Sequence, residues 1–176
     1  MKIVFTGAES TYKSTLAKAI SAKFALNYVP EFARTYLEEF SPGTPVDPMP
    51  RSAYDQIEEG QLLLQNNNAY FTENGRGVFD TDGTVLHIWK QDKFGESDTQ
   101  LLRIPEDVIY FLCYPNVKAG QDPLRVDVQR REELHQRYAA LLSQLPNRVI
   151  HLNEETLEAR IATAQKVIKE LLNDAV

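Results

Sequence analysis

The sequence contains a single cysteine, Cys113, and no long run of apolar residues. One cysteine excludes an internal disulfide and the paired-cysteine motifs of zinc sites, and its place within the apolar run 108–114 predicts a core residue. A membrane-spanning helix needs about 18 consecutive apolar residues, so no transmembrane segment is expected. Met1 and Lys2 lead directly into a short apolar segment without the pattern of a secretory signal, which predicts a cytoplasmic protein.

Basic residues are also in deficit, with 19 Lys and Arg against 25 Asp and Glu and a net charge of −6. This charge opposes nonspecific attraction to nucleic-acid backbones and to anionic lipid surfaces. We therefore expect neither nucleic acid nor a membrane as a partner, and small-molecule chemistry is favoured. The 176 residues, 43% of them hydrophobic, suffice for one well-buried core but not for two ordinary domains with a linker, so one domain is expected over residues 1–176.

Short apolar segments alternate with segments whose apolar residues recur at helical spacing. Strands are predicted at 2–6, 26–29, 77–80, 107–114 and 148–152, and helices at 14–24, 32–40, 52–73, from about 81 to 89, from about 131 to 145, and 156–172. Four prolines within residues 41–50 exclude regular structure there and predict a surface loop. Because strands alternate with helices, the pattern indicates βαβ units, a parallel sheet and an α/β fold.

The strongest motif follows the first predicted strand and opens the first predicted helix. It reads Gly7, Ala8, Glu9, Ser10, Thr11, Tyr12, Lys13, Ser14, with Thr15 next. In a phosphate-binding loop (P-loop), backbone N–H groups and the helix N-terminus surround the β-phosphate of ATP. The lysine reaches the β and γ oxygens, and the following hydroxyl ligates Mg²⁺. The sequence therefore predicts that residues 7–15 bind ATP, with Lys13 and Ser14 in these two roles.

Tyr12 breaks the motif, because GxxxxGK[ST] has its second glycine at this position. If the loop holds this residue in a left-handed conformation, a side chain there costs roughly 1–2 kcal/mol. We then expect either a deformed loop or packing of the phenol ring that offsets the strain, and weakened triphosphate binding. The alternative interpretation is an ordinary turn with a solvated Lys13, but a cation in the first turn opposes the helix dipole.

Two acidic residues, Glu31 and Asp80, each follow a predicted strand. The carboxyl ends of parallel strands are the edge at which open α/β sheets bind ligands. Phosphoryl transfer needs positioning, charge neutralisation and a carboxylate that orients or deprotonates the attacking hydroxyl. Glu31 and Asp80 are the candidates for these tasks, against the alternative of solvated loop carboxylates. Glu31 and Asp82 are also candidates for substrate binding, and Asp82 could exchange roles with Asp80.

The P-loop, the segment 28–36 and Phe79-Asp80-Thr81-Asp82 followed by Trp89 together resemble the P-loop kinase domain of bacterial ribosylnicotinamide kinases. In that family the domain is often fused to a nicotinamide mononucleotide adenylyltransferase, whose HxGH motif is absent from this sequence. The resemblance implies a three-layer P-loop nucleoside triphosphate hydrolase fold with a five-stranded parallel sheet of nucleotide-kinase type. It also implies transfer of phosphate from ATP, with Mg²⁺, to the 5′-hydroxyl of nicotinamide riboside in NAD biosynthesis.

Roles for individual residues follow from the same resemblance. Glu31 resembles the carboxylate that related nucleoside kinases place after the second strand as a base, and Asp80 resembles the acid that holds Mg²⁺ through water. Residues 116–131 resemble a lid, in which Asp122-Pro123-Leu124-Arg125 replaces a DGLR-like stretch and makes Arg125 a catalytic candidate.

Four further residues are candidates for substrate contacts or for the core. Arg34 lies three residues after Glu31 and could pair with it or bind a substrate phosphate. Trp89, Tyr36 and Tyr54 could stack on a nicotinamide or nucleobase ring, although aromatic residues at helical spacing are more often core residues. The lid also contains Arg130 and Arg131, which could reach a transferring phosphate.

Two alternative functions stay open at this point. Tyr12 suggests a P-loop domain that has lost transferase activity and senses a nucleotide or metabolite. A kinase of the same fold could also act on another nucleoside-like acceptor.

Overall fold

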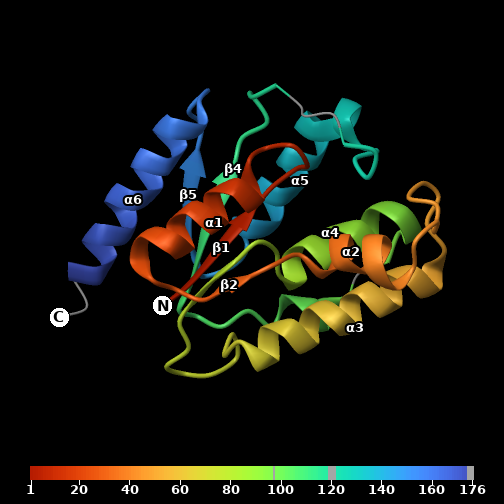
Figure 1. The fold of residues 1–176 in the computed structure, drawn as a ribbon, viewed down its shortest axis with the longest axis horizontal. Helices are drawn as coiled ribbons and strands as arrows, with labels where there is room; N and C mark the ends of the chain where they lie inside the picture. The colour runs from red at the N-terminus through yellow and green to blue at the C-terminus, as the bar shows by residue number, and fades with distance from the viewer. Residues whose placement is uncertain (97, 119–121, 174–176) are drawn as a thin grey trace.

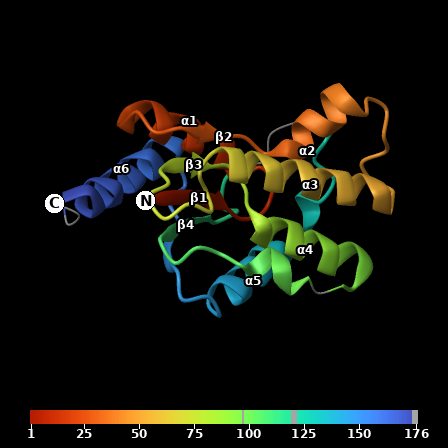
Figure 2. The same ribbon diagram turned by 90° about the horizontal axis from the view of Figure 1, so that it is seen from below.

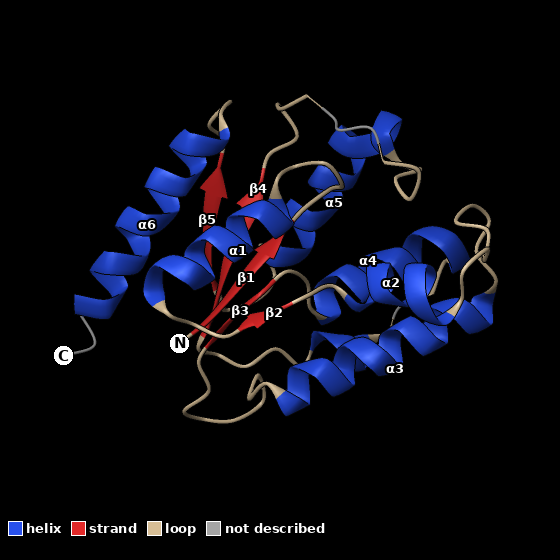
Figure 3. Ribbon diagram, in the orientation of Figure 1, coloured by secondary structure: helices blue, strands red, loops and turns tan. Residues whose placement is uncertain are grey.

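The computed structural model describes residues 1–96, 98–118 and 122–173, and within them five parallel strands form one sheet (Figure 1). The order across the sheet is β2-β3-β1-β4-β5. The strands are β1 (Lys2–Thr6), β2 (Tyr28–Val29), β3 (Gly77–Phe79), β4 (Val108–Cys113) and β5 (Arg148–Leu152). In the central strand, Lys2 lies opposite Gly77 of β3 on one side and Val108 of β4 on the other. The strand arrows point the same way (Figure 3), which confirms the predicted parallel sheet.

Helices connect the strands, and several of their bounds differ from the predicted ones. They are α1 (Lys13–Phe24), α2 (Phe32–Thr35), α3 (Arg51–Asn67), α4 (Gly83–Phe94), α5 (Arg131–Leu142) and α6 (Leu157–Asn173). A π-helical turn, Tyr36–Phe40, continues α2, and 3₁₀ turns occupy Thr99–Leu102 and Val128–Arg130. Residues 41–50, all of them described, form no helix or strand, as predicted.

The helix predicted to end at 145 ends at Leu142, and three other differences from the predicted elements have local causes. The predicted helix 52–73 ends at Asn67 because the Asn68 side chain donates to the Leu64 carbonyl (2.8 Å) and Ala69 turns left-handed (φ 63°). The predicted strand 26–29 loses its first half because Leu26 N–H donates back to α1, which ends at a left-handed residue. The helix predicted to end at 89 continues to Phe94 and ends at Gly95 (φ 68°).

The sheet is covered by helices on both faces, which gives three layers (Figure 2). Side chains alternate along β1, so Ile3 and Phe5 pack with α1 and α6 while Val4 packs with α4 and α5. A third apolar cluster joins α2, α3 and α4 beyond the β2 edge. No helix in the described part of the chain is long and apolar enough to cross a bilayer.

Candidate active site

The predicted P-loop connects β1, the central strand, to α1 and contains three residues with positive φ. Gly7 (φ 124°) is required by packing, because a Cβ there would lie 2.8 Å from the Cys113 carbonyl oxygen. Cys113 itself is fully buried, as predicted. Ser10 (φ 55°) and Tyr12 (φ 71°) are left-handed without being glycines. The chain therefore makes a tight turn in front of α1 with two strained residues.

Tyr12 has the left-handed backbone for which the sequence analysis predicts strain. It occupies the N-cap position of α1 with φ 71° and ψ 11°, in the left-handed region where a side chain is disfavoured. Its phenol ring packs against the core cluster formed by β1, α1 and α6. Packing of the ring thus offsets the strain that the left-handed backbone imposes on Tyr12.

Lys13, the first residue of α1, is held close to the loop. Its Nζ donates to the Ala8 carbonyl oxygen at 2.7 Å. Burial lowers the pKa of Lys13, and the nearby carboxylates of Glu31 and Asp80 oppose this effect. The ammonium group thus lies within the electrostatic reach of both predicted carboxylates.

Glu31 and Asp80 lie at the same edge of the sheet as the P-loop. Glu31 is the N-cap residue of α2, and the N–H of the next residue, Phe32, donates to Gln61 Oε1 (2.7 Å) in α3. Burial raises the pKa of Glu31, and the negative charge of Asp80 raises it further. Glu31 is therefore a stronger base than an exposed glutamate.

Asp80 follows β3 and is only 3% exposed. Its Oδ2 accepts from the Tyr28 hydroxyl at 3.2 Å. Its Oδ1 is buried and has no hydrogen-bond partner among the described residues. A buried carboxylate oxygen without a donor is costly, and a cation or its coordinated water would satisfy it.

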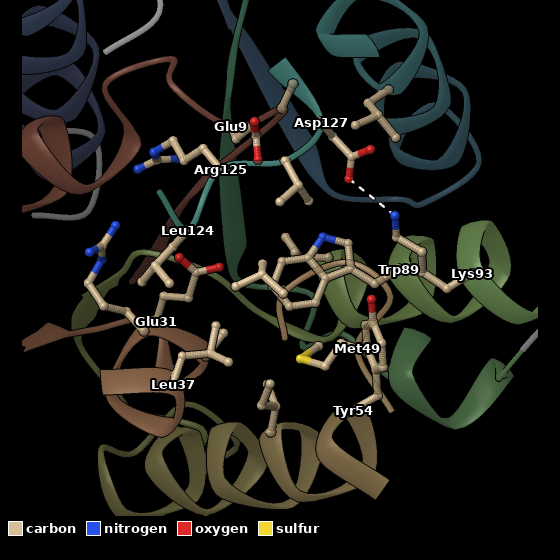
Figure 4. Close-up of a pocket in the computed structure, with 18 of the residues that line it drawn as sticks. Glu9, Glu31, Leu37, Met49, Tyr54, Trp89, Lys93, Leu124, Arg125 and Asp127 are labelled. Carbon is tan, nitrogen blue, oxygen red and sulfur yellow. Dashed lines mark hydrogen bonds and ion pairs between the residues drawn. The ribbon is translucent and has the colours of Figure 1, made fainter. Parts of the chain in front are cut away.

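Two neighbouring cavities open at this edge. The first, here called the loop cavity, is lined by the P-loop and residues facing it: Ser10, Thr11, Tyr12, Lys13, Ser14, Thr15, Glu31, Lys118, Asp122 and Arg125. The second, the side cavity, is lined by Gly7, Ala8 and Glu9 of the P-loop and by residues from α2, α3, α4, α5 and the lid segment (Figure 4). Lys13, Glu31 and Arg125 line both cavities. These three residues mark the place where the two cavities meet.

The side cavity combines an apolar wall with charged groups at its rim. Figure 4 shows the Trp89 indole in the middle of the view, with Met49 and Tyr54 on one side and charged residues on the other. Trp89 and Tyr54 are packed edge to face, with ring centroids 6.4 Å apart and planes at 81°. Two of the three predicted aromatic residues thus line the cavity. Tyr36 instead is buried in the cluster of α2, α3 and α4.

Three charged residues of the predicted lid, Lys118, Asp122 and Arg125, line the loop cavity, and residues 119–121 of the lid lie outside the described residues. Asp122 accepts from Arg34 Nη2 and lies 3.3 Å from Arg125 Nε. Arg34 also donates to Glu38 Oε1 (2.7 Å), so it pairs with these two carboxylates rather than with Glu31.

The other two lid arginines have different partners. Arg130 pairs with Asp92 (2.7 Å) on α4. Arg131 donates to the Ser10 carbonyl oxygen (3.1 Å) in the P-loop.

Asp82 does not take the role that the sequence suggested. It is fully buried, and its Oδ1 accepts from the backbone N–H of Thr84 (3.0 Å), which caps α4. Tyr70 and Tyr110 donate to its Oδ2. Asp82 lines neither of the two cavities. The expected substrate contact is therefore replaced by a helix cap, which the pattern Asp82-Gly83-Thr84 could have indicated.

Sequence reasoning missed two charged residues of the side cavity, Lys93 and Asp127, and one of the loop cavity, Lys118. Lys93 and Asp127 face each other, with 3.5 Å between Nζ and Oδ2 (Figure 4). Lys93 lies four residues after Trp89 on α4, and this spacing places both side chains on one helix face. Asp127 lies inside the predicted lid, where only arginines were considered. The helical spacing was thus the available signal for Lys93.

The described residues contain no cluster of three His, Cys, Asp or Glu side chains that could hold a metal alone. Mg²⁺ in phosphoryl-transfer sites is usually held by one or two protein groups together with substrate phosphates and water. The Ser14 hydroxyl in the loop cavity and the unpartnered Asp80 oxygen fit that requirement.

A family model described as AAA domain matches residues 2–160, nearly the whole chain. The chain belongs to the AAA domain family. No curated protein matches this AAA domain in sequence. The matched residues include the P-loop and all five strands of the sheet.

Solved structures share the fold at low sequence identity. NadR protein in complex with NR gives a TM-score of 0.71 at 17% identity, covering 96% of this chain and 50% of that chain. NadR in complex with NAD and AMP-PNP also gives 0.71, at 20% identity, covering 96% and 48%. Deoxyadenosine kinase from M. mycoides with products dCMP and dCDP gives 0.67 at 16% identity, covering 97% and 100%.

These likenesses confirm the predicted three-layer P-loop fold with a five-stranded parallel sheet of nucleotide-kinase type. The AAA domain spans about half the length of the NadR chains and the full length of the deoxyadenosine kinase chain.

Proposed function

We propose that this AAA domain is a kinase that transfers the γ-phosphate of ATP to a hydroxyl group of a small nucleoside-type acceptor. The observation that carries the proposal is the junction of the two cavities at Lys13, Glu31 and Arg125. A cation, a carboxylate of raised pKa and an arginine are the groups that phosphoryl transfer needs at the transferring phosphate. The loop cavity then holds the donor, and the side cavity holds the acceptor.

In the donor half, backbone N–H groups of residues 7–15 and the N-terminus of α1 surround the triphosphate. Lys13 leaves the Ala8 carbonyl and binds the β and γ oxygens. Ser14 and Asp80 would hold Mg²⁺, and the bound ion would supply positive charge that neutralises the charge developing on the phosphates. Arg125, paired with Asp122 and facing the loop cavity, adds a second positive charge at the γ-phosphate.

In the acceptor half, Glu31 orients the attacking hydroxyl and accepts its proton. Its raised pKa makes it basic enough for this task, and it lines the same junction as Lys13 and Arg125, which would bind the phosphate. The Trp89 indole and Tyr54 offer a flat apolar surface for an aromatic ring.

Nicotinamide riboside is the acceptor we propose first. Its pyridinium ring is cationic, and a cation over an indole face gains cation–π attraction. The NadR protein that shares the fold is named as a complex with NR, and the deoxyadenosine kinase makes a deoxynucleoside the second candidate. The role proposed for the first acceptor lies in NAD biosynthesis.

A panel experiment tests the proposal. The purified protein is incubated with ATP and Mg²⁺ and, separately, with nicotinamide riboside, deoxyadenosine, deoxycytidine or no acceptor, and products are identified by mass spectrometry. We expect a monophosphate of nicotinamide riboside, with ADP formed in equal amount. The Lys13→Ala variant is the matched negative control.

Other outcomes separate the alternatives. A deoxynucleoside monophosphate as product would support the proposed kinase activity but with a deoxynucleoside as the acceptor. Thermal stabilisation by ATP without any product would favour the sensor function that Tyr12 suggests. No stabilisation and no product would overturn the nucleotide site itself.

A further inference from the structure

Arg160, on α6, is a fully buried arginine that contacts the P-loop from behind. Its Nη1 donates to the Thr11 carbonyl oxygen at 3.0 Å. Its Nη2 donates to the Tyr114 carbonyl (2.8 Å) and to Asn116 Oδ1. Its Nε donates to the Glu154 carbonyl (2.7 Å). One guanidinium therefore joins the P-loop to the segments that follow β4 and β5.

All four acceptors of Arg160 are uncharged oxygens. Among the described residues, no carboxylate oxygen lies within ion-pair distance of its guanidinium. A buried cation without a paired carboxylate is unfavourable unless its hydrogen bonds are satisfied. An apolar side chain could fill this space, so packing alone does not explain an arginine at position 160. The oxygens to which its guanidinium donates indicate its role.

The contact with Thr11 sets the direction of one peptide group in the loop. In a planar trans peptide, the carbonyl oxygen and the N–H point in opposite directions. Because the Thr11 carbonyl points to Arg160, the N–H of Tyr12 points away from α6, and Tyr12 lines the loop cavity. The structure gives that N–H no acceptor among the described residues. The side chain of Thr11 is also held, because its hydroxyl donates to the Ala8 carbonyl oxygen (2.8 Å).

We propose that Arg160 is a positioning residue of the P-loop. It holds the Thr11–Tyr12 peptide with its N–H toward the triphosphate and thereby keeps Tyr12 left-handed, the conformation that glycine adopts freely in the usual motif. Arg160 and Tyr12 act together: the buried arginine stabilises in Tyr12 the left-handed conformation that a glycine would adopt without it. The inference rests on the proposed nucleotide site.

The test is a double-mutant cycle on Arg160 and Tyr12, read as the Kd for ATP with Mg²⁺ by calorimetric titration. Arg160→Met keeps the approximate volume and removes the donors, so Tyr12 relaxes and must be returned to the left-handed form on binding. We expect about tenfold weaker binding, which equals 1.4 kcal/mol. Tyr12→Gly alone should change Kd by less than about threefold, because Arg160 already holds the parent loop in position. This replaces the expectation from sequence that Tyr12 weakens triphosphate binding.

The decisive variant combines both substitutions. Since glycine has no left-handed penalty, Arg160→Met should weaken binding by less than about threefold in the Tyr12→Gly background. A residue that only stabilises the fold, or acts only through its charge, would cause the same loss in both backgrounds. Equal losses would therefore overturn the proposal.

Two controls complete the design. Arg148→Met removes an exposed arginine on β5, and its Kd should equal that of the parent. Circular dichroism and melting curves check that each variant is folded. If Arg160→Met does not fold, the double-mutant cycle is measured with Arg160→Lys instead. A parent protein that fails to bind ATP would contradict the proposed function, whereas binding with additive effects would contradict only the role of Arg160.

Discussion

Lys13→Ala is expected to lose most of the thermal stabilisation that ATP with Mg²⁺ gives the parent protein. A ligand that binds only the native state stabilises it by RT ln(1 + [L]/Kd), about 2.7 kcal/mol at a hundredfold excess over Kd. A hydrogen bond to a charged group contributes about 1.5–3 kcal/mol, so removing the ammonium weakens binding roughly ten- to hundredfold. At the upper end, the same ATP concentration stabilises the variant by only about 0.4 kcal/mol.

The matched control is Lys23→Ala, which removes one positive charge from the exposed last turn of the same helix. This variant should keep the full ATP-dependent shift in melting temperature. Melting curves of all three proteins with and without millimolar ATP and Mg²⁺ supply the comparison. If Lys13→Ala is stabilised as strongly as the parent, Lys13 does not bind the triphosphate.

Local patterns were sufficient to predict most of the fold. The five strands and their parallel arrangement follow from short apolar runs that alternate with helical spacing, because both signals depend on residues close in sequence. The helix end at Asn67 was missed, since a side-chain hydrogen bond from Asn68 to Leu64 competes with the helical pattern. Such contacts alter boundaries without changing the element order.

The position of a candidate site residue could be predicted where an acidic residue directly follows a strand. Glu31 and Asp80 each follow a strand, so the topology of a parallel sheet brings them to the P-loop. Asp82 looked equivalent to Asp80 in the sequence, but α4 begins at the next residue, and Asp82 is buried as the cap of that helix. Arg160 lies 149 residues after Thr11, and no local pattern indicates that its side chain reaches the loop.

Asp80→Asn is expected to lower kcat by at least about a hundredfold, or roughly 2.7 kcal/mol of transition-state stabilisation, with little change in the Kd for ATP. The amide oxygen can still accept from the Tyr28 hydroxyl, so the local fold is retained. The carboxylate charge next to Mg²⁺ is lost, and this charge matters most when the phosphate is transferred. Binding should persist because, in the proposed site, Lys13 and the loop N–H groups hold the triphosphate.

Glu31→Gln provides the contrasting variant, and Asp55→Asn, on the exposed surface of α3, provides the control. Glu31→Gln should lower kcat and raise KM for the acceptor together, because Glu31 contacts the acceptor in the proposed site. Asp55→Asn should keep parental kinetics. Steady-state rates with ATP and the acceptor varied in turn separate these effects. Parental kcat in both Asp80→Asn and Glu31→Gln would show that these carboxylates take no part in transfer.

The pH dependence of the residual activity of Asp80→Asn gives an independent check. Glu31 acts as a base only when deprotonated, and the negative charge of Asp80 contributes to the raised pKa of Glu31. Removing that charge lowers the pKa of Glu31, so the acidic limb of the kcat/KM profile should move to lower pH relative to the parent. An acidic limb that moves to higher pH, or does not move, would mean that Glu31 is not the group whose ionisation limits the reaction.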